Sequence, residues 1–405
     1  MKTRYGPSPW IALFPDTRRP SLPALRGERT ADVIIVGAGL TGVATAYLCA
    51  AAGMRPYVIE SHRIGQGSAG RSAGLLLPEP GPAFKDVVAA HGLRAGRKIF
   101  ESWRRGSLDA ASLLRRLGVK CGLEAQDDLL VAPPFGDRLL RREHDARVAA
   151  GLGARWLTDK QIKQLAKLDA SGGIASRDAF VLDPYRACLG IASAARKRGA
   201  RLFEESHVKK VAFGKKGVEV TLDDAVVRAS TIVVTTGVAT PEFKPLRRHF
   251  KRRQTYLALT EPMPAAVRTQ MLPSTLTLHD SRMPRHRLRW TPDGRMLIAG
   301  ADQDEPPARL RDAVLRQRTG QLMYELLTMY PGISGLQPEY GWDLTYGETA
   351  DGLMYIGPHR NYPHHLFALG GRGDSITGAF LAARILVRAL RSEAQKGDDV
   401  FGWTR

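Results

Sequence analysis

Residues 32–60 read DVIIVGAGLTGVATAYLCAAAGMRPYVIE, and this stretch decides the fold. The apolar run at its start, 33–36, is typical of a strand buried in a parallel sheet. The small residues of 43–52 predict a helix, which ends at Gly53 because glycine commonly follows the last turn of a helix. Residues 57–59 predict a second strand. The order strand, helix, strand is that of a parallel β-α-β unit.

Three glycines, Gly37, Gly39 and Gly42, join the first strand to the helix with the spacing G-x-G-x-x-G. The first permits a tight turn, the second lets a pyrophosphate approach the backbone, and the third lets helix and strand pack closely. Glu60 lies 23 residues after Gly37, near the ~20 expected of a carboxylate that binds ribose hydroxyls. The glycine spacing alone also fits an ordinary turn. Together with the two strands, the helix and the carboxylate it predicts a dinucleotide site and disfavours NADP.

A second glycine-rich segment, residues 65–74 with the sequence GQGSAGRSAG, follows soon after Glu60. Ser68 and Ser72 could donate hydrogen bonds to phosphate, and the glycines let the backbone lie against a ring. These features favour a cofactor that continues past its first phosphates, as FAD does. A flexible surface loop has a similar composition and is the alternative interpretation.

With these motifs the chain resembles the D-amino-acid oxidase, glycine oxidase and sarcosine oxidase (DAO) superfamily of FAD-dependent oxidoreductases. Within it, the chain is most similar to the branch that contains gamma-glutamylputrescine oxidoreductase. The resemblance covers almost the whole chain. Besides the glycine-rich segments, it rests on YGPSPW at 5–10, GARLFE at 199–204, TIVVTTG at 231–237 and DGLMYIGPHRNYPHHLFALGGRGDSIT at 351–377. The resemblance implies an enzyme that oxidises the C–N bond of an amine or amino acid.

The resemblance also implies which residues hold FAD. They come from the first turn, the end of the second strand, the loop 65–74, the segment that leads to Val208, the end of TIVVTTG and the C-terminal glycine segment. These residues are Gly37, Ala38, Gly39, Leu40, Thr41, Gly42, Glu60, Ser61, Gly67, Ser68, Arg71, Ser72, Ala73, Gly74, Val208, Thr236, Gly237, Gly370, Gly371, Arg372, Gly373, Asp374, Ser375 and Ile376.

The C-terminal glycine segment makes physical sense without the resemblance. Its glycines allow the backbone to approach a ligand, and Ser375 or Thr377 could cap the apolar helix expected at 378–390. The start of that helix would stabilise negative charge on the flavin ring. A plain glycine-rich connection is the alternative. Asp374 and Ser375 replace the His or Asn and the Gly that are commoner in this branch.

The resemblance further predicts that FAD is bound without a covalent bond. Relatives that attach the flavin use a Cys ahead of the C-terminal segment or a His in the first loop. Residues 342–350, WDLTYGETA, contain no Cys, and Arg71 occupies the first-loop position. His62 is nearby in sequence but does not match the attachment position.

The fold class that the resemblance implies is α/β. A Rossmann-like FAD-binding domain of the glutathione-reductase type is joined to a second, antiparallel-sheet α+β substrate domain. The expected division is an N-terminal arm at 1–29, an FAD domain and a substrate domain. The FAD domain comprises 30–82, 170–240 and 338–400, and the substrate domain comprises 83–169 and 241–337. The sequence supports this with helical patterns at 83–117 and 136–167, a strand at 127–133 and strand-like runs between 253 and 300.

In this superfamily no side chain is obligatory as a general base, because the flavin accepts a hydride from the α-carbon and the imine then hydrolyses. Residues that position the substrate are therefore the candidates for the catalytic site. Arg289 lies on a predicted strand where relatives place a carboxylate-binding arginine, although it could also be a surface residue. Tyr256 could line the same pocket or lie in the core, and Arg372 could face the flavin edge or solvent.

Composition limits the other possibilities. Lys and Arg number 60 against 40 Asp and Glu, a formal net charge of +20, so a nucleic-acid partner such as tRNA has to be considered. No nucleic-acid motif accompanies the charge, and an NAD-dependent dehydrogenase would not explain the C-terminal segment. Three scattered cysteines, no apolar leader, no membrane-length apolar run and no zinc-ligand spacing predict a cytoplasmic enzyme without a metal, acting on a small molecule.

Overall fold

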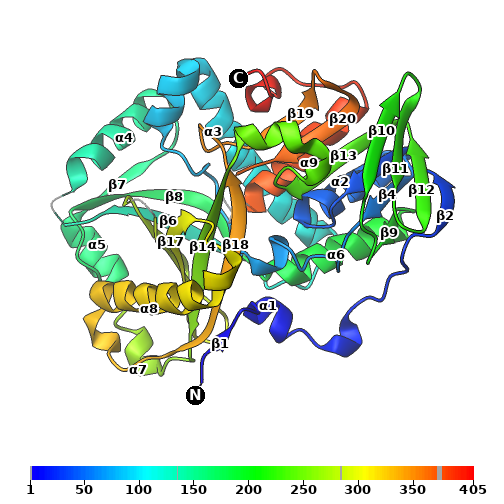
Figure 1. Ribbon diagram of the computed structural model, residues 1–405. Coiled ribbons are helices and arrows are strands. Elements are labelled where there is room, and N and C mark those ends of the chain that lie inside the picture. Colours follow the sequence, from blue (N-terminus) through cyan, green and yellow to red (C-terminus); the bar gives the residue numbers. More distant parts are fainter. Residues whose placement is uncertain (1, 135, 283–284, 372–375) are drawn as a thin grey trace.

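The computed structural model describes residues 2–134, 136–282, 285–371 and 376–405, which form three sheets and their covering helices (Figure 1). The helices pack against the two larger sheets and, in the case of the ten-stranded sheet, lie on both of its faces. They are α1 (Pro9–Ala12), α2 (Leu40–Ala51), α3 (Phe84–Arg116), α4 (Asp137–Ala149), α5 (Asp159–Ala166), α6 (Pro184–Lys197), α7 (Ala265–Arg268), α8 (Arg311–Met329) and α9 (Ile376–Leu390). Short 3-10 helices lie at Asp16–Arg18, Ala69–Arg71, Pro241–His249, Ala308–Leu310, Pro331–Ile333 and Asp399–Phe401.

A six-stranded sheet contains the β-α-β unit of the first glycine motif. Its strand order is β19 (Tyr355–His359), β20 (Tyr362–Leu369), β13 (Thr231–Gly237), β3 (Val33–Val36), β4 (Pro56–Ile59) and β9 (Arg201–Phe203). All neighbours are parallel except β19 and β20. Helices α2, α6 and α9 cover one face with a shared apolar core. The predicted strands 33–36 and 231–237 are confirmed to the residue.

A four-stranded sheet covers the opposite face of the parallel sheet, at the right of Figure 1. It consists of β10 (Lys210–Gly214), β11 (Gly217–Thr221), β12 (Ala225–Ala229) and β2 (Gly27–Thr30). Its strands are antiparallel except for the parallel pair of β12 and β2. This layering of helices, parallel sheet and small, mostly antiparallel sheet agrees with the predicted glutathione-reductase type. The predicted α/β fold class is confirmed.

The largest sheet has ten strands and is mixed. It runs from β1 (Arg4–Tyr5) through β18 (Pro338–Glu348), β14 (Lys251–Thr260), β17 (Met296–Asp304), β16 (Arg287–Trp290), β15 (Leu276–Asp280), β6 (Glu124–Ala132) and β8 (Gly172–Val181) to β5 (Leu75–Leu76), with β7 (Arg155–Thr158) also on β8. Most neighbours are antiparallel, but β1 pairs with β18 and β15 pairs with β6 in parallel. Helices α5 and α8 pack on its outer face.

Strand pairing crosses the predicted domain limits. Residues 172–181 and 338–348 were expected in the FAD domain, yet both strands pair within the ten-stranded sheet. Helix α3, expected in the substrate domain, packs against α9 of the FAD-binding layer. Local patterns identify a strand but do not say which sheet it joins, and the division into two functional domains stays a prediction. The strand β7 inside 136–167 is an element that the sequence did not predict.

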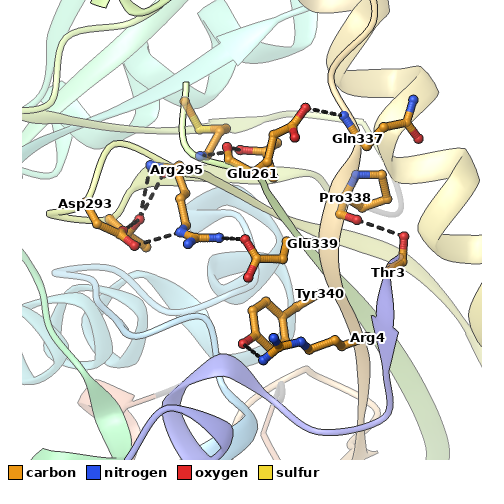
Figure 2. A network of polar contacts seen from close by, with 12 residues as sticks. Thr3, Arg4, Glu261, Asp293, Arg295, Gln337, Pro338, Glu339 and Tyr340 are labelled. Carbon is orange, nitrogen blue, oxygen red and sulfur yellow. Dashed lines mark hydrogen bonds and ion pairs between the residues drawn. The ribbon is translucent and has the colours of Figure 1, made fainter. Parts of the chain in front are cut away.

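The N-terminal arm is fixed to the edge of the ten-stranded sheet (Figure 2). Thr3 Oγ1 donates a hydrogen bond to the carbonyl oxygen of Pro338 at 2.8 Å, and Arg4 Nη1 donates to the hydroxyl of Tyr340 at 2.9 Å. Beside them, Arg295 forms an ion pair with Glu339. The arm is therefore part of the fold. Among the described helices, none has the length and apolar character needed to cross a bilayer.

The turn between β3 and α2 depends on Gly42. A Cβ atom there would collide with the carbonyl oxygen of Gly37, because helix and strand approach each other at this point. Gly37 itself has a φ of +99°, which favours glycine. Thr235, a residue that the sequence analysis did not single out, donates its hydroxyl to the carbonyls of Val36 at 2.9 Å and Gly37 at 3.0 Å.

We expect Gly42→Ala to lower the free energy of unfolding by about 1–3 kcal/mol, because the backbone must move to admit the methyl group. Gly39→Ala is the matched control, since its φ is −74° and an added Cβ would meet no atom within 4 Å. Urea unfolding of both variants without cofactor measures the difference. Equal stability of the two variants would contradict the close approach.

Candidate cofactor and substrate site

A cleft of about 230 Å³ lies at the carboxyl ends of β3, β13 and β20. It brings together four segments that the sequence predicted to bind one cofactor. The residues that line it are Gly39, Leu40, Thr41, Ser68, Ala69, Ser72, Thr235, Thr236, Gly237, Val238, Arg252, Thr345, Tyr346, Met354, Ala368, Gly370, Gly371, Ile376 and Ala379. A crevice beyond the carboxyl ends of parallel strands is the usual ligand site of such sheets.

The backbone at the N-terminus of helix α2 fits a pyrophosphate. Gly39 is the N-cap of the 12-residue helix, so the unpaired N–H groups of the first turn lie at the cleft. No acidic residue occupies that first turn. A Cβ atom on Gly39, Gly67 or Gly237 would meet nothing within 4 Å, so the backbone is open to a ligand at all three positions.

Glu60 extends from the end of β4, where the sequence placed a ribose-binding carboxylate. Its Oε2 accepts a hydrogen bond from the Ala38 amide at 2.8 Å. Its Oε1 accepts from the His62 amide at 3.0 Å and from the Ser61 hydroxyl at 3.2 Å. A carboxylate has about four acceptor positions, so the carboxylate is held in place and can still accept from a ribose hydroxyl. Ala38 and Ser61 thus orient Glu60.

The N-terminal arm holds the second glycine-rich loop. Ser8 donates its hydroxyl to the carbonyl of Gly70, and Trp10 Nε1 donates to the carbonyl of Ser72 at 2.9 Å. Arg71 of this loop donates to the carboxylate of Asp343 at 2.6 Å and to the Asp343 carbonyl at 2.7 Å. Burial raises the pKa of Asp343, but Arg311 and Arg71 outweigh it and bring that pKa below its usual range. The ion pair fixes the loop against β18.

Some of the other residues predicted to bind FAD or to cap α9 do not have the predicted role or are not described. Val208 lies in the core between the two smaller sheets and not in the cleft. The segment before it passes beside Glu60, since the Ser206 amide donates to the Glu60 carbonyl at 2.9 Å. Arg372, Gly373, Asp374 and Ser375 lie outside the described residues. Thr377 does not cap α9, because its hydroxyl donates to the carbonyl of Leu77 at 2.7 Å.

Arg289 is a structural residue at the joint between the ten-stranded sheet and the second loop. Its guanidinium is 2% exposed, and Nη1 donates to the carbonyls of Gly74 at 2.7 Å, Leu182 at 2.9 Å and Ala73 at 3.2 Å. It also lies over the ring of Trp10. Burial lowers the pKa of Arg289 to about 10, so it stays charged at neutral pH. These contacts replace the predicted carboxylate clamp.

Tyr256 lies in the core and not in a substrate pocket. It is fully buried in the apolar cluster between the ten-stranded sheet and α8. Its hydroxyl accepts a hydrogen bond from Gln303 Nε2 at 2.9 Å. The alternation of residues along a strand shows which residues share a face, but it does not show which face points to the site.

A second, polar chamber meets the cofactor cleft at Gly371, which lines both. Its lining residues come from segments far apart in sequence. They are Leu77, Glu79, Pro80, Gly81, Trp103, Asp128, His279, Arg285, Arg287, Gly352, Gly371 and Thr377. Asp128, His279 and Arg287 form its floor on β6, β15 and β16. These residues could not be identified from the sequence, because no spacing relates them.

The floor of this chamber is a satisfied charge network. The ring nitrogen Nδ1 of His279 lies 3.3 Å from Asp128 Oδ1, and Thr277 donates to the same oxygen at 2.7 Å. Burial alone would raise the pKa of Asp128, but His279, Thr277 and Arg287 together bring it below its usual range. Across the chamber, Glu79 accepts from Arg147 at 2.6 Å.

The fold and the cleft define a dinucleotide-binding protein with a second, polar chamber beside the cofactor. The chain belongs to the DAO family, FAD dependent oxidoreductase, whose sequence profile matches residues 32–389. FAD is therefore the cofactor that the cleft is built to hold, and the alternative of an NAD-dependent dehydrogenase is not favoured.

Individual relatives agree with this assignment. The chain is 25% identical to the "Probable oxidoreductase OrdL" of Haemophilus influenzae over 92% of this chain and 86% of that protein. It is 24% identical to the "Gamma-glutamylputrescine oxidoreductase" of Escherichia coli over 91% of this chain and 85% of that protein. The crystal structure of glycine oxidase from Geobacillus kaustophilus has the same fold, with a TM-score of 0.76, 18% identity and coverage of 93% of this chain and 99% of that chain.

We expect Glu60→Ala to weaken FAD binding by about one to two orders of magnitude. The ribose hydroxyls lose a charged acceptor worth roughly 1.5–3 kcal/mol, and ~1.4 kcal/mol is tenfold in affinity. Titration of the apoprotein with FAD, followed by flavin fluorescence, measures the change. Unchanged affinity would show that Glu60 does not contact the cofactor.

We expect Arg289→Met to destabilise the protein by roughly 3–5 kcal/mol and to weaken FAD retention, because three buried carbonyls lose a charged donor. Thermal unfolding and the flavin content after purification are the measurements. Arg55→Met, which removes an exposed ion pair with Asp32, is the control. A normal melting temperature with only a raised KM would instead support the predicted carboxylate clamp.

Proposed function

We propose that the enzyme oxidises the C–N bond of a small amine or amino acid with non-covalently bound FAD. The substrate lies in the polar chamber, its α-carbon gives up a hydride toward the cofactor cleft, and the resulting imine hydrolyses in water. When bound, FAD accepts the hydride and its two electrons. The observation that carries the proposal is the meeting of cleft and chamber at Gly371. The similarity to a glycine oxidase and to a gamma-glutamylputrescine oxidoreductase supports this substrate class.

Arg287 is the residue that we propose binds a substrate carboxylate, in place of Arg289. Both lie on β16 two residues apart, so both point to the same face of the sheet. Arg289 turns to the carbonyls of the second loop, whereas Arg287 lines the chamber. Arg285 lines the chamber as well, and its Nη1 donates to the Gly81 carbonyl at 2.7 Å. Two guanidinium groups make the chamber suitable for an acidic substrate group.

The absence of a covalent link to FAD is supported by what surrounds the cleft. Among the described residues that line it, neither a cysteine nor a histidine occurs. All three cysteines are buried elsewhere. Burial raises the pKa of Cys49 to about 12 and that of Cys121 to about 11, so both stay protonated thiols. Free buried thiols also fit the reducing cytoplasm, where we place the enzyme.

We expect the purified protein to be yellow and to release FAD on acid denaturation. Under anaerobic conditions an amino acid should bleach the flavin faster than the amine made from it by decarboxylation. Arg287→Met should raise the apparent Kd of the amino acid about 10- to 100-fold and leave the plain amine nearly unaffected, because only the carboxylate loses its partner. A colourless protein that takes up no FAD would overturn the proposal. Faster bleaching by the plain amine would overturn only the proposal that the substrate carries a carboxylate.

A further inference from the structure

We propose that His279 is the base that removes a proton from the ammonium group of the substrate, and that Asp128 holds its imidazole in place. This inference rests on the proposed oxidation of an amine and adds a residue that acts directly on the substrate. Hydride transfer to FAD does not by itself say which group removes the ammonium proton, and the inference assigns this role to the floor of the polar chamber.

The fold places His279 and Asp128 on adjacent parallel strands. Thr277 of β15 lies opposite Asp128 of β6, and His279 follows two residues later on the same face. The side chains are 9% and 3% exposed, so the pair is shielded from bulk water. Thr277 donates its hydroxyl to Asp128 and fixes the carboxylate. A buried carboxylate of this kind orients an imidazole and stabilises its charged form.

The second ring nitrogen of His279 is the one available to a substrate. Nδ1 lies 3.3 Å from Asp128 Oδ1, and among the described residues Nε2 has no hydrogen-bond partner. The ring lines the chamber that meets the cofactor cleft at Gly371. A substrate whose carboxylate binds Arg287, directly opposite His279 across the β15–β16 pair, would bring its amine to this ring.

The chemistry requires that the ammonium group lose a proton before the hydride leaves, and a base in the chamber would speed this loss. At neutral pH an amine is an ammonium ion, and its nitrogen has no lone pair with which to form a C=N bond. In the proposed step one N–H bond breaks and the proton moves to Nε2 of His279, while the N–H electrons stay on nitrogen as a lone pair. That pair becomes the second C–N bond as the hydride leaves the α-carbon toward bound FAD. The charge gained by His279 lies next to the Asp128 carboxylate.

Among the described residues, the charged groups that line the chamber with His279 come from four segments. Asp128 comes from β6, Arg287 from β16, Arg285 from the segment before β16, and Glu79 from the segment after β5. Asp128, whose pKa lies below its usual range, stays ionised at neutral pH.

A second histidine pair in the same sheet provides a matched control. His286 Nδ1 lies 2.9 Å from Asp280 Oδ2, and these side chains are 7% and 5% exposed. Burial and pairing are thus similar to those of His279 and Asp128. His286 does not line the chamber, and its amide also donates to Asp280, so that pair closes the turn before β16.

The test is the rate of anaerobic flavin bleaching by the best substrate of the wild type, measured from mildly acidic pH up to the pKa of the substrate's amine. For His279→Gln we expect a rate about 100-fold lower than wild type at neutral pH. The deficit should shrink as pH rises, because solvent then removes the proton. Asp128→Asn should show a smaller deficit of the same pH dependence, and His286→Gln should keep the wild-type pH profile.

Three outcomes would overturn the inference. A deficit of His279→Gln that is the same at every pH would show a structural role, and a raised Kd with an unchanged limiting rate would show a positioning role. A wild type that no amine or amino acid bleaches would overturn the proposed function as well, so the two failures are distinguishable. If His279→Gln does not retain FAD, Asp128→Asn carries the test, because it keeps the imidazole and changes only its partner.

Discussion

The buried guanidinium of Arg289 fixes the joint between the two halves of this enzyme. A charge removed from water is costly unless it is fully hydrogen-bonded, and here four backbone carbonyls and an aromatic ring supply the compensation. Three of the carbonyls belong to the second glycine-rich loop and to the residue after β8, while the arginine and the fourth carbonyl belong to β16. The loop and the floor of the substrate chamber therefore cannot move independently. Arg287 lies two residues away on the same strand, so the contacts that fix Arg289 also fix the position of Arg287.

Much of the cofactor side could be predicted from the sequence, because its signals are local. The strand at 33–36, the glycine turn and Glu60 follow each other within one β-α-β unit, and each residue has a geometric requirement of its own. Gly42 must lack a side chain, and Glu60 must end a strand. What the sequence could not show is Thr235, which locks the turn from a strand nearly two hundred residues away.

The residues around the polar chamber are brought together by pairing between distant strands, which the sequence does not show. Arg289, the arginine expected to bind a carboxylate, donates to backbone carbonyls, whereas Arg287, two residues earlier on the same strand, lines the chamber. Tyr256 has the correct strand but the wrong face. Asp128 and His279 carried no signal, since their contact exists only because β6 and β15 pair.

The basic composition has a structural explanation at its two densest stretches. In the first, Lys251, Arg252 and Arg253 pair with Asp304 and Glu305 across the β14–β17 edge. In the second, Arg289 is buried and Arg295 is paired with Asp293 and Glu339. The charges of these cations are balanced by neighbouring carboxylates or buried in the fold. Gly371 lies where the cofactor cleft meets the polar chamber. Its φ is +91°, and a Cβ atom would lie 2.7 Å from Met354 Cγ, so only bare backbone fits between the two cavities. In the proposed function, FAD supplies the redox chemistry on one side of this backbone, and the charges of the chain bind the substrate on the other.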